Sequence, residues 1–179
     1  MARYVALLYS IVLPDRRIRA ADLIELAEAT GLTAPYPVLA SGNLLFEARR
    51  QPTVELEKRL DAAFLARHGK PVPIIVRTAA DWQRLPAQNP FPAESARDGS
   101  RVAARIQRDR LGSSAVDLLA PYRQPDEGLA IVEGDLWVSF PVQMSQRRLL
   151  AALTPKRLGI GTLRNWNTIR KIAGLLENG

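Results

Sequence analysis

The stretch TVELEKRLDAAFLARHGKPVPIIVR, residues 53–77, decides the fold of the first half of the chain. Its apolar residues recur at the spacing of one helix face, at Leu56, Leu60 and Phe64, which predicts a helix over residues 53–67. Gly69 is a natural stop for that helix, because glycine readily adopts the left-handed conformation found at helix ends. The run Ile74-Ile75-Val76 that follows is typical of a buried strand.

The elements upstream complete one half of a mixed α+β fold. Short apolar runs and helical spacing predict a strand over 3–8, a helix over 20–30 and extended segments over 37–40 and 44–47. The residues between the two extended segments, Ser41-Gly42-Asn43, have the composition of a hairpin turn. With the stretch at 53–77, the order is strand, helix, strand, strand, helix, strand, which is ferredoxin-like.

The downstream half repeats part of this order. Residues 86–100 contain three prolines and little apolar periodicity, which predicts a linker. After it come a strand, a short helix, a hairpin and a helix capped by Ser145, at residues 102–107, 113–119, 129–140 and 145–153. The closing strand is expected to be missing, replaced by a final helix. The sequence thus predicts an α+β protein of two ferredoxin-like halves in tandem, 1–85 and 101–179, both of the βαββα type.

Composition excludes several classes of function. Among 179 residues there is no cysteine and one histidine, which excludes disulfide scaffolds, thiolate catalysis and multi-histidine metal centres. No cofactor or metal is therefore expected. His68 lies at the predicted end of a helix, where a structural role is favoured over general-base catalysis. No apolar run approaches the length of a membrane span and no signal peptide is evident, so a cytoplasmic protein is expected, with no membrane partner.

The net charge of +7 is concentrated near the C-terminus. Residues 1–135 are nearly neutral, whereas residues 136–176 contain no acidic residue. The basic residues of that segment are Arg147, Arg148, Lys156, Arg157, Arg164, Arg170 and Lys171. Such a concentration of positive charge attracts nucleic acid or another polyanion, although a solvated basic face without a ligand would look the same.

The final helix is expected to be amphipathic. Trp166, Ile169 and Leu176 share one arc, while Arg164, Asn167 and Lys171 fall together on the opposite, solvent-facing arc. Gly159-Ile160-Gly161 before it begins like a dinucleotide-binding loop, but the third glycine is replaced by Arg164. These glycines could instead form a turn that binds an anion at the start of the helix. An ordinary capped helix start without a ligand is favoured over that interpretation.

Five motifs together resemble the domain of unknown function (DUF) 1697 family. They are the opening Tyr4-Val5-Ala6-Leu7-Leu8, then Ser41-Gly42-Asn43 with Leu44-Leu45-Phe46, Val76-Arg77-Thr78, Asn89-Pro90-Phe91-Pro92, and Arg164-Asn165-Trp166-Asn167-Thr168. The resemblance runs in order over essentially the whole chain and implies a ferredoxin-like α+β fold in a cytoplasmic bacterial protein. It implies no activity. Two loops depart from the family pattern, at Tyr9–Pro14 and at Val142-Gln143, so a family site built on them would be altered here.

Three hypotheses about function follow. In the first, the basic C-terminal half holds nucleic acid. In the second, a cleft between the two halves binds, or acts on, a small anionic or phosphorylated ligand. In the third, which is the favoured interpretation of the Arg164–Thr168 motif, the motif is structural and a mostly buried Trp166 is its anchor. Whether the protein is an enzyme stays open, because no general base is evident. Ligand-binding candidates are Ser41, Gly42, Asn43, Arg77, Arg164, Asn165, Asn167 and Lys171.

Overall fold

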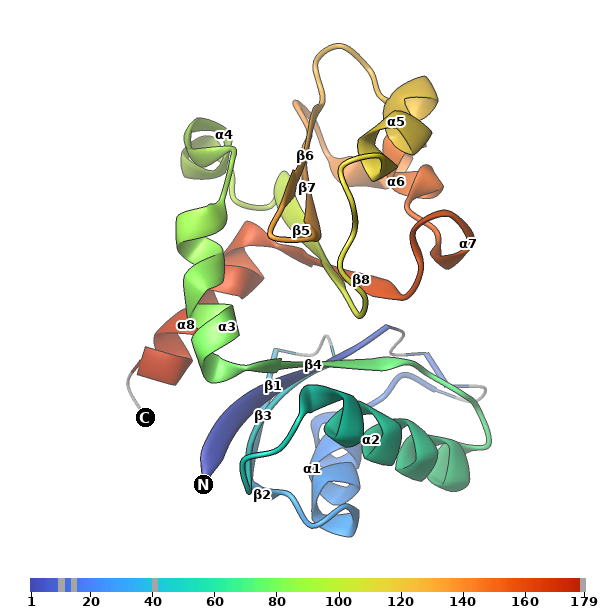
Figure 1. The fold of residues 1–179 in the computed structure, drawn as a ribbon, viewed down its shortest axis with the longest axis vertical. Helices are drawn as coiled ribbons and strands as arrows, with labels where there is room; N and C mark the ends of the chain where they lie inside the picture. Colours follow the sequence, from blue (N-terminus) through green and yellow to red (C-terminus); the bar gives the residue numbers. More distant parts are fainter. Residues whose placement is uncertain (10–11, 14–15, 40–41, 178–179) are drawn as a thin grey trace. The chain divides into compact units, whose positions relative to one another are not determined.

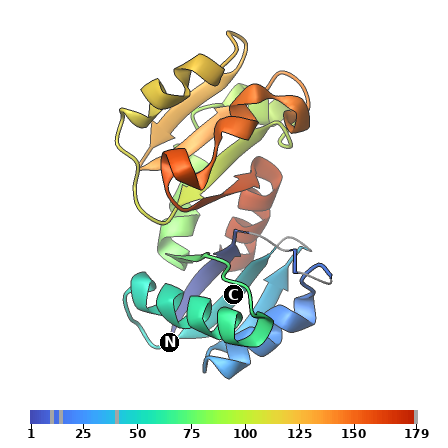
Figure 2. The same ribbon diagram turned by 90° about the vertical axis from the view of Figure 1, so that its right-hand side faces the viewer.

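The computed structural model describes residues 1–9, 12–13, 16–39 and 42–177. The chain divides into two compact units, Met1–Gln83 and Arg84–Asn178, and each is described by itself. Each unit contains a four-stranded antiparallel sheet with helices, which confirms the predicted fold class of two ferredoxin-like halves (Figures 1 and 2). Three residues of the unusual loop after the first strand, Ser10, Ile11 and Pro14, lie outside the described residues.

The first unit has the strand and helix order expected from the sequence. Its sheet has the order β2-β3-β1-β4. The strands are β1 (Ala2–Leu8), β2 (Thr33–Val38), β3 (Asn43–Ala48) and β4 (Ile74–Thr78), and the helices are α1 (Ala20–Ala29), α2 (Thr53–His68) and α3 (Ala79–Arg84). Helices α1 and α2 cover one face of the sheet (Figure 2), where Leu26, Leu56 and Phe64 pack against the strands in one core.

The outer edge of this sheet is covered by carboxylates of α2. β4 is the edge strand of this sheet, so its outward-facing N–H groups have no neighbouring strand to bind among the described residues. The Ile74 N–H donates to Asp61 Oδ1 at 2.7 Å, and the Val76 N–H donates to Glu57 Oε1 at 2.9 Å. These two bonds fix the position of β4, and with it the end of the strand at Thr78.

The start of α1 is held by one buried carboxylate. Asp22 receives two hydrogen bonds from the Arg16 guanidinium, at 2.6 and 2.8 Å, and one from the Arg19 N–H at 2.6 Å. The Arg16 hydrogen bonds lower the pKa of Asp22 from 3.8 to about 2, against the opposing effect of burial. Because the folded state has the lower pKa, this stabilisation is complete above the unfolded pKa and is lost as the pH falls through about 2.

We expect Asp22→Asn to destabilise the protein by about 2 kcal/mol near neutral pH, the free energy that corresponds to this pKa difference. The difference in free energy of unfolding between wild type and variant should narrow steadily below about pH 4. Urea unfolding of both proteins, followed by circular dichroism at a series of pH values, measures this difference in free energy. A difference that stays constant down to about pH 2 would show that the Asp22 carboxylate contributes nothing through its charge.

The second unit has a sheet of the order β6-β7-β5-β8. Its strands are β5 (Val102–Gln107), β6 (Gly128–Val132), β7 (Asp135–Ser139) and β8 (Gly161–Asn165). Its helices are α4 (Pro92–Arg97), α5 (Ala115–Leu119), α6 (Arg148–Ala152), α7 (Pro155–Leu158) and α8 (Trp166–Glu177), with short 3₁₀ turns η1 (Leu85–Gln88), η2 (Ala120–Tyr122) and η3 (Met144–Gln146). Residues 86–100, predicted as a linker, contain α4 and all but the first residue of η1, and they belong to this unit.

The prediction that the second half lacks a closing strand is wrong. β8 pairs antiparallel with β5 along its whole length, from Ala103 opposite Asn165 to Gln107 opposite Gly161. The glycines suggested a loop, but Gly161 is needed for packing: a Cβ there would lie 2.3 Å from Nη1 of the buried Arg105. The dinucleotide-loop and anion-turn readings also fail, because Gly161 begins a strand and not a helix.

The two faces of the second sheet are covered by different helices. Leu136 and Val138 of β7 pack in a core with residues of α5, α6 and α7. Trp137 alternates to the other face, where it meets Trp166 of α8. Figure 1 shows α8 on the side of the sheet opposite to α5, α6 and α7, and α8 contacts β5, β8 and η1. This places the start of α8 beside the segment that precedes β5.

Candidate functional site

Helix α8 presents a polar face next to a buried one. Ile169, Ile172 and Leu176 are buried, whereas the exposed side chains are those of Asn167, Arg170, Lys171 and Glu177. The Asn165 side chain caps the helix, since its Oδ1 accepts the Thr168 N–H at 3.0 Å. Asn165 therefore has a local structural role, while the exposed residues of the first two turns are available to a ligand.

A pocket of about 690 Å³ lies against this polar face. Trp166, Asn167 and Arg170 line it from α8, and residues between Pro86 and Gly99 line it from the other side. None of its ten lining residues is acidic. The two sides are in close contact at Gly99, where a Cβ would lie 2.2 Å from Asn167 Oδ1 and 3.0 Å from Trp166 Cδ1. The pocket thus joins two of the quoted motifs, Asn89–Pro92 and Arg164–Thr168.

The wall opposite α8 is held in place by its own hydrogen bonds. Asn89 Oδ1 accepts the Phe91 N–H at 2.9 Å, and Asn89 Nδ2 donates to Ser95 Oγ at 2.9 Å. Ser95 Oγ donates in turn to the Pro92 carbonyl at 3.1 Å. The Phe91 ring packs beside Gly128, where a Cβ would lie 2.6 Å from it. Asn89 accordingly shapes this wall, and the exposed polar side chains that line the pocket from α8 are Asn167 and Arg170.

Trp166 is half-buried, where the sequence predicted a mostly buried anchor. Its ring packs at an angle of 57° against Trp137, with 6.3 Å between ring centroids. Trp137 and Trp82 are both fully buried, so Trp166 is the one tryptophan of three with solvent access. Its inner side is a packing surface, and its outer side forms part of the pocket.

Arg164 does not lie on the exposed face of α8, as the helical arc predicted. It belongs to β8, and its guanidinium is buried and donates to Thr162 Oγ1 at 2.7 Å and to the Leu163 carbonyl at 2.9 Å. Burial lowers the pKa of Arg164 to about 10. The helix begins two residues later than the pattern required, so the arc of α8 contains Asn167 and Lys171 without Arg164.

The ligand-binding candidates that belong to the first unit are far in sequence from those of β8 and α8. Asn43 is fully buried, and its Nδ2 donates to the Val38 carbonyl at 3.1 Å, which closes the β2–β3 turn. Gly42 adopts a φ of 70° in that turn, and Ser41 lies outside the described residues. Arg77 is half-buried on β4. Asn43 and Arg77 are on strands either side of β1, opposite Leu7 and Val5.

His68 is the last residue of α2, one residue beyond the predicted end of the helix, and so lies at a helix end as the sequence indicated. Its ring packs against Phe64 with 4.6 Å between ring centroids, and Gly69 follows with a left-handed φ of 65°. Among the described residues, no group of three or more histidine, cysteine, aspartate or glutamate side chains is arranged to hold a metal ion. None of the helices in the described part of the chain has the length and hydropathy to cross a membrane.

A family model for proteins of unknown function, DUF1697, matches residues 1–137. The chain belongs to the DUF1697 family. The matched region includes β1 to β6 and the first three residues of β7, and it ends before β8 and α8, so the Arg164–Thr168 motif lies outside it. A solved structure of a conserved bacterial protein from Streptococcus pneumoniae is similar over 99% of both chains, with 22% identity and a TM-score of 0.74, and supports the fold. No curated protein matches the chain.

Proposed function

We propose that the second unit binds single-stranded nucleic acid at the pocket on α8. The observation that carries this proposal is the association of one solvent-accessible tryptophan with an exposed arginine and an exposed amide in a pocket without acidic lining residues. Unstacked bases bind to aromatic faces, and phosphates bind to arginine. A role with nucleic acid is consistent with the cytoplasmic location that the sequence predicts.

Each α8 side chain has a separate task in this proposal. Trp166 supplies a surface for stacking a base, and Arg170, one helical turn later on the same face, supplies the phosphate contact. Asn167 has an amide that can donate to and accept from a base edge. Gly99 leaves the space that Asn167 and Trp166 occupy, so the shape of the pocket depends on that glycine.

The seven basic residues of the C-terminal segment do not all serve this site. Arg147 lies 3.7 Å from the Glu127 carboxylate, and Arg157 stacks over Tyr122 at 4.6 Å from the ring centroid. With Arg164 buried, Arg170 and Lys171 remain as exposed cations on α8. Arg97, which lies in the chain between the pocket residues Ala96 and Gly99, is also exposed. Three phosphate contacts of this kind predict a slope of log K against log salt of about −2.

Fluorescence anisotropy with a labelled oligonucleotide of about 20 nucleotides tests the proposal. Trp166→Ala should weaken binding about 5- to 100-fold, the range for loss of one base stack. Arg170→Gln should weaken binding and make the salt slope shallower by about 0.7. The matched control is Arg148→Gln, an equal loss of charge at an exposed site on α6, which packs on the other face of the sheet. If the control reduces affinity as much as Arg170→Gln, binding is not located at α8.

Tryptophan fluorescence gives a second readout, because Trp82 and Trp137 are buried and only Trp166 can stack on a base. The oligonucleotide should quench the wild-type emission and leave Trp166→Phe nearly unchanged. A small phosphorylated ligand is the second candidate, favoured by the pocket volume of about 690 Å³, which is in the size range of small-molecule sites. Equal affinity for a mononucleotide and the oligonucleotide would favour that candidate.

A further inference from the structure

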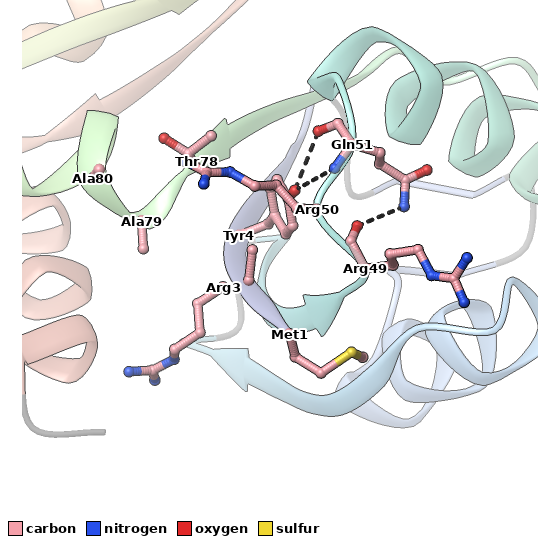
Figure 3. A pocket seen from close by; sticks show the side chains of 10 residues that line it. Met1, Arg3, Tyr4, Arg49, Arg50, Gln51, Thr78, Ala79 and Ala80 are labelled. Carbon is pink, nitrogen blue, oxygen red and sulfur yellow. Dashed lines mark hydrogen bonds between the residues drawn. The ribbon is translucent and has the colours of Figure 1, made fainter.

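A second pocket, of about 750 Å³, lies in the first unit at the end of its sheet where β1 begins and β3 and β4 finish. The strand register brings these ends together, since Ala2 is opposite Ala48 and Tyr4 is opposite Thr78. The lining combines Met1, Ala2, Ala79 and Ala80 with three arginines, and none of the ten lining residues is acidic. Figure 3 shows these side chains around Tyr4.

The backbone that carries two of the arginines is fixed by Tyr4. The Tyr4 hydroxyl donates to the Gln51 carbonyl at 3.2 Å and accepts the Gln51 N–H at 3.1 Å. Tyr4 itself is 1% exposed and stacks on Phe46, with 5.5 Å between ring centroids. The Gln51 side chain donates to the Arg49 carbonyl at 3.0 Å. Because these hydrogen bonds already hold the backbone of residues 49–51, this segment loses little conformational entropy when its side chains bind a ligand.

The three arginines differ in their availability to this pocket. In Figure 3 the side chain of Arg50 extends toward Thr78, whereas that of Arg49 points away from it. Arg3 is half-buried and lies opposite Glu47 on β3. Thr78 Oγ1 donates to Asp81 Oδ2 at 2.7 Å, so its hydroxyl hydrogen already has an acceptor. Arg50 is exposed and is therefore the residue best placed to bind an anion over the apolar lining.

We propose that this pocket binds a small amphiphilic anion, a carboxylate or phosphate monoester carried on an apolar body. The Arg50 guanidinium binds the charged group, for which its planar pair of N–H donors is suited. Met1 and the alanines at positions 2, 79 and 80 contact the apolar body, as expected for a pocket with few polar groups in a mainly apolar wall. This binding is independent of the nucleic-acid proposal, because it uses residues of the first unit.

Titration of the full chain with octanoate and with octyl phosphate, followed by amide NMR shifts, tests the proposal. Both ligands should cause saturable shifts at residues 50–51 and 78–80, and whichever binds more tightly identifies the charged group. Octanol and inorganic phosphate, which carry only one of the two features, should bind at least about tenfold more weakly. Equal affinity for octanol, or the absence of saturable shifts at these residues, would overturn the proposal.

Arg50→Gln should weaken octanoate or octyl phosphate binding about tenfold, the loss expected for a charge-assisted hydrogen bond. The control Arg59→Gln removes an equal charge from the exposed surface of α2, outside the pocket, and should leave the affinity unchanged. Equal loss in the two variants would show that only the net charge matters and would contradict a site at Arg50. Oligonucleotide binding at α8 should be the same in both variants, which separates this test from that of the proposed function.

Discussion

Replacement of Trp137 by alanine is expected to destabilise the second unit by about 3–5 kcal/mol, the cost of truncating a large buried aromatic side chain. Trp137 is fully buried in β7, between Ala104 of β5 and Ala130 of β6 in the strand register. Small neighbours on both sides cannot expand to fill the cavity, so the loss should lie toward the upper part of that range. Urea unfolding followed by far-UV circular dichroism measures the change.

Two variants make this prediction specific. Trp137→Phe should cost much less than Trp137→Ala, because the ring remains and because the buried indole N–H has no hydrogen-bond acceptor among the described residues. Trp166→Ala should also cost less, since Trp166 is only half-buried. If Trp166→Ala proves as destabilising as Trp137→Ala, Trp166 is the structural anchor predicted from the sequence. The loss of ligand binding in Trp166→Ala would then have a structural cause.

The second large effect is expected for Gly161→Ala, at about 3 kcal/mol. The added Cβ would lie 2.3 Å from Arg105 Nη1 and 2.6 Å from Gln107 Oε1, closer than atoms can approach. Arg105 is 2% exposed and donates to Gln107 Oε1 at 2.6 Å and to the Gly159 carbonyl at 2.8 Å. Displacing its guanidinium would break charge-assisted bonds in a buried place, each worth roughly 1.5–3 kcal/mol.

A double-mutant cycle and a matched glycine test this explanation. In an Arg105→Met background the long charged group is absent, so Gly161→Ala should cost less than it does in wild type. Gly112→Ala is the control, because the nearest atom to its added Cβ is Ser114 Oγ at 3.9 Å. If the cost of Gly161→Ala is the same in both Arg105 backgrounds, the Arg105 side chain is not the cause of the destabilisation.

The local elements with strong patterns were predictable from the chain alone. Helix α2 begins at Thr53 as expected and ends at His68, one residue later than expected, because its apolar spacing and Gly69 are local signals. The order of elements in the first unit follows from the same kind of signal. Strand β8 was not predictable, because its residues form a strand only through hydrogen bonds to β5. The glycine at position 161 is explained only by the neighbouring Arg105, which leaves no room for a side chain there.

The candidate site on α8 was likewise predictable from the sequence only in part. The concentration of positive charge predicted a binding role for the C-terminal segment. Asn167 and Lys171 are exposed on α8 as expected. The partner wall at residues 86–99 was missed, because prolines and low apolar periodicity indicated a linker. The sequence did contain one signal for this wall, the Asn89–Pro92 motif, which lies in a segment with little apolar periodicity. Arg170 also belonged to the basic segment but not to the quoted ligand-binding candidates.

By itself the sequence determined the two-half α+β architecture, the absence of cysteine chemistry and the concentration of positive charge, since periodicity, composition and charge are properties of the chain. Only the tertiary structure decided which cations are accessible: it buries Arg164, pairs Arg147 with Glu127 and leaves Arg170 beside Trp166. The physical reason is that burial and ion pairing depend on neighbours distant in the chain, which sheet pairing and core packing bring together.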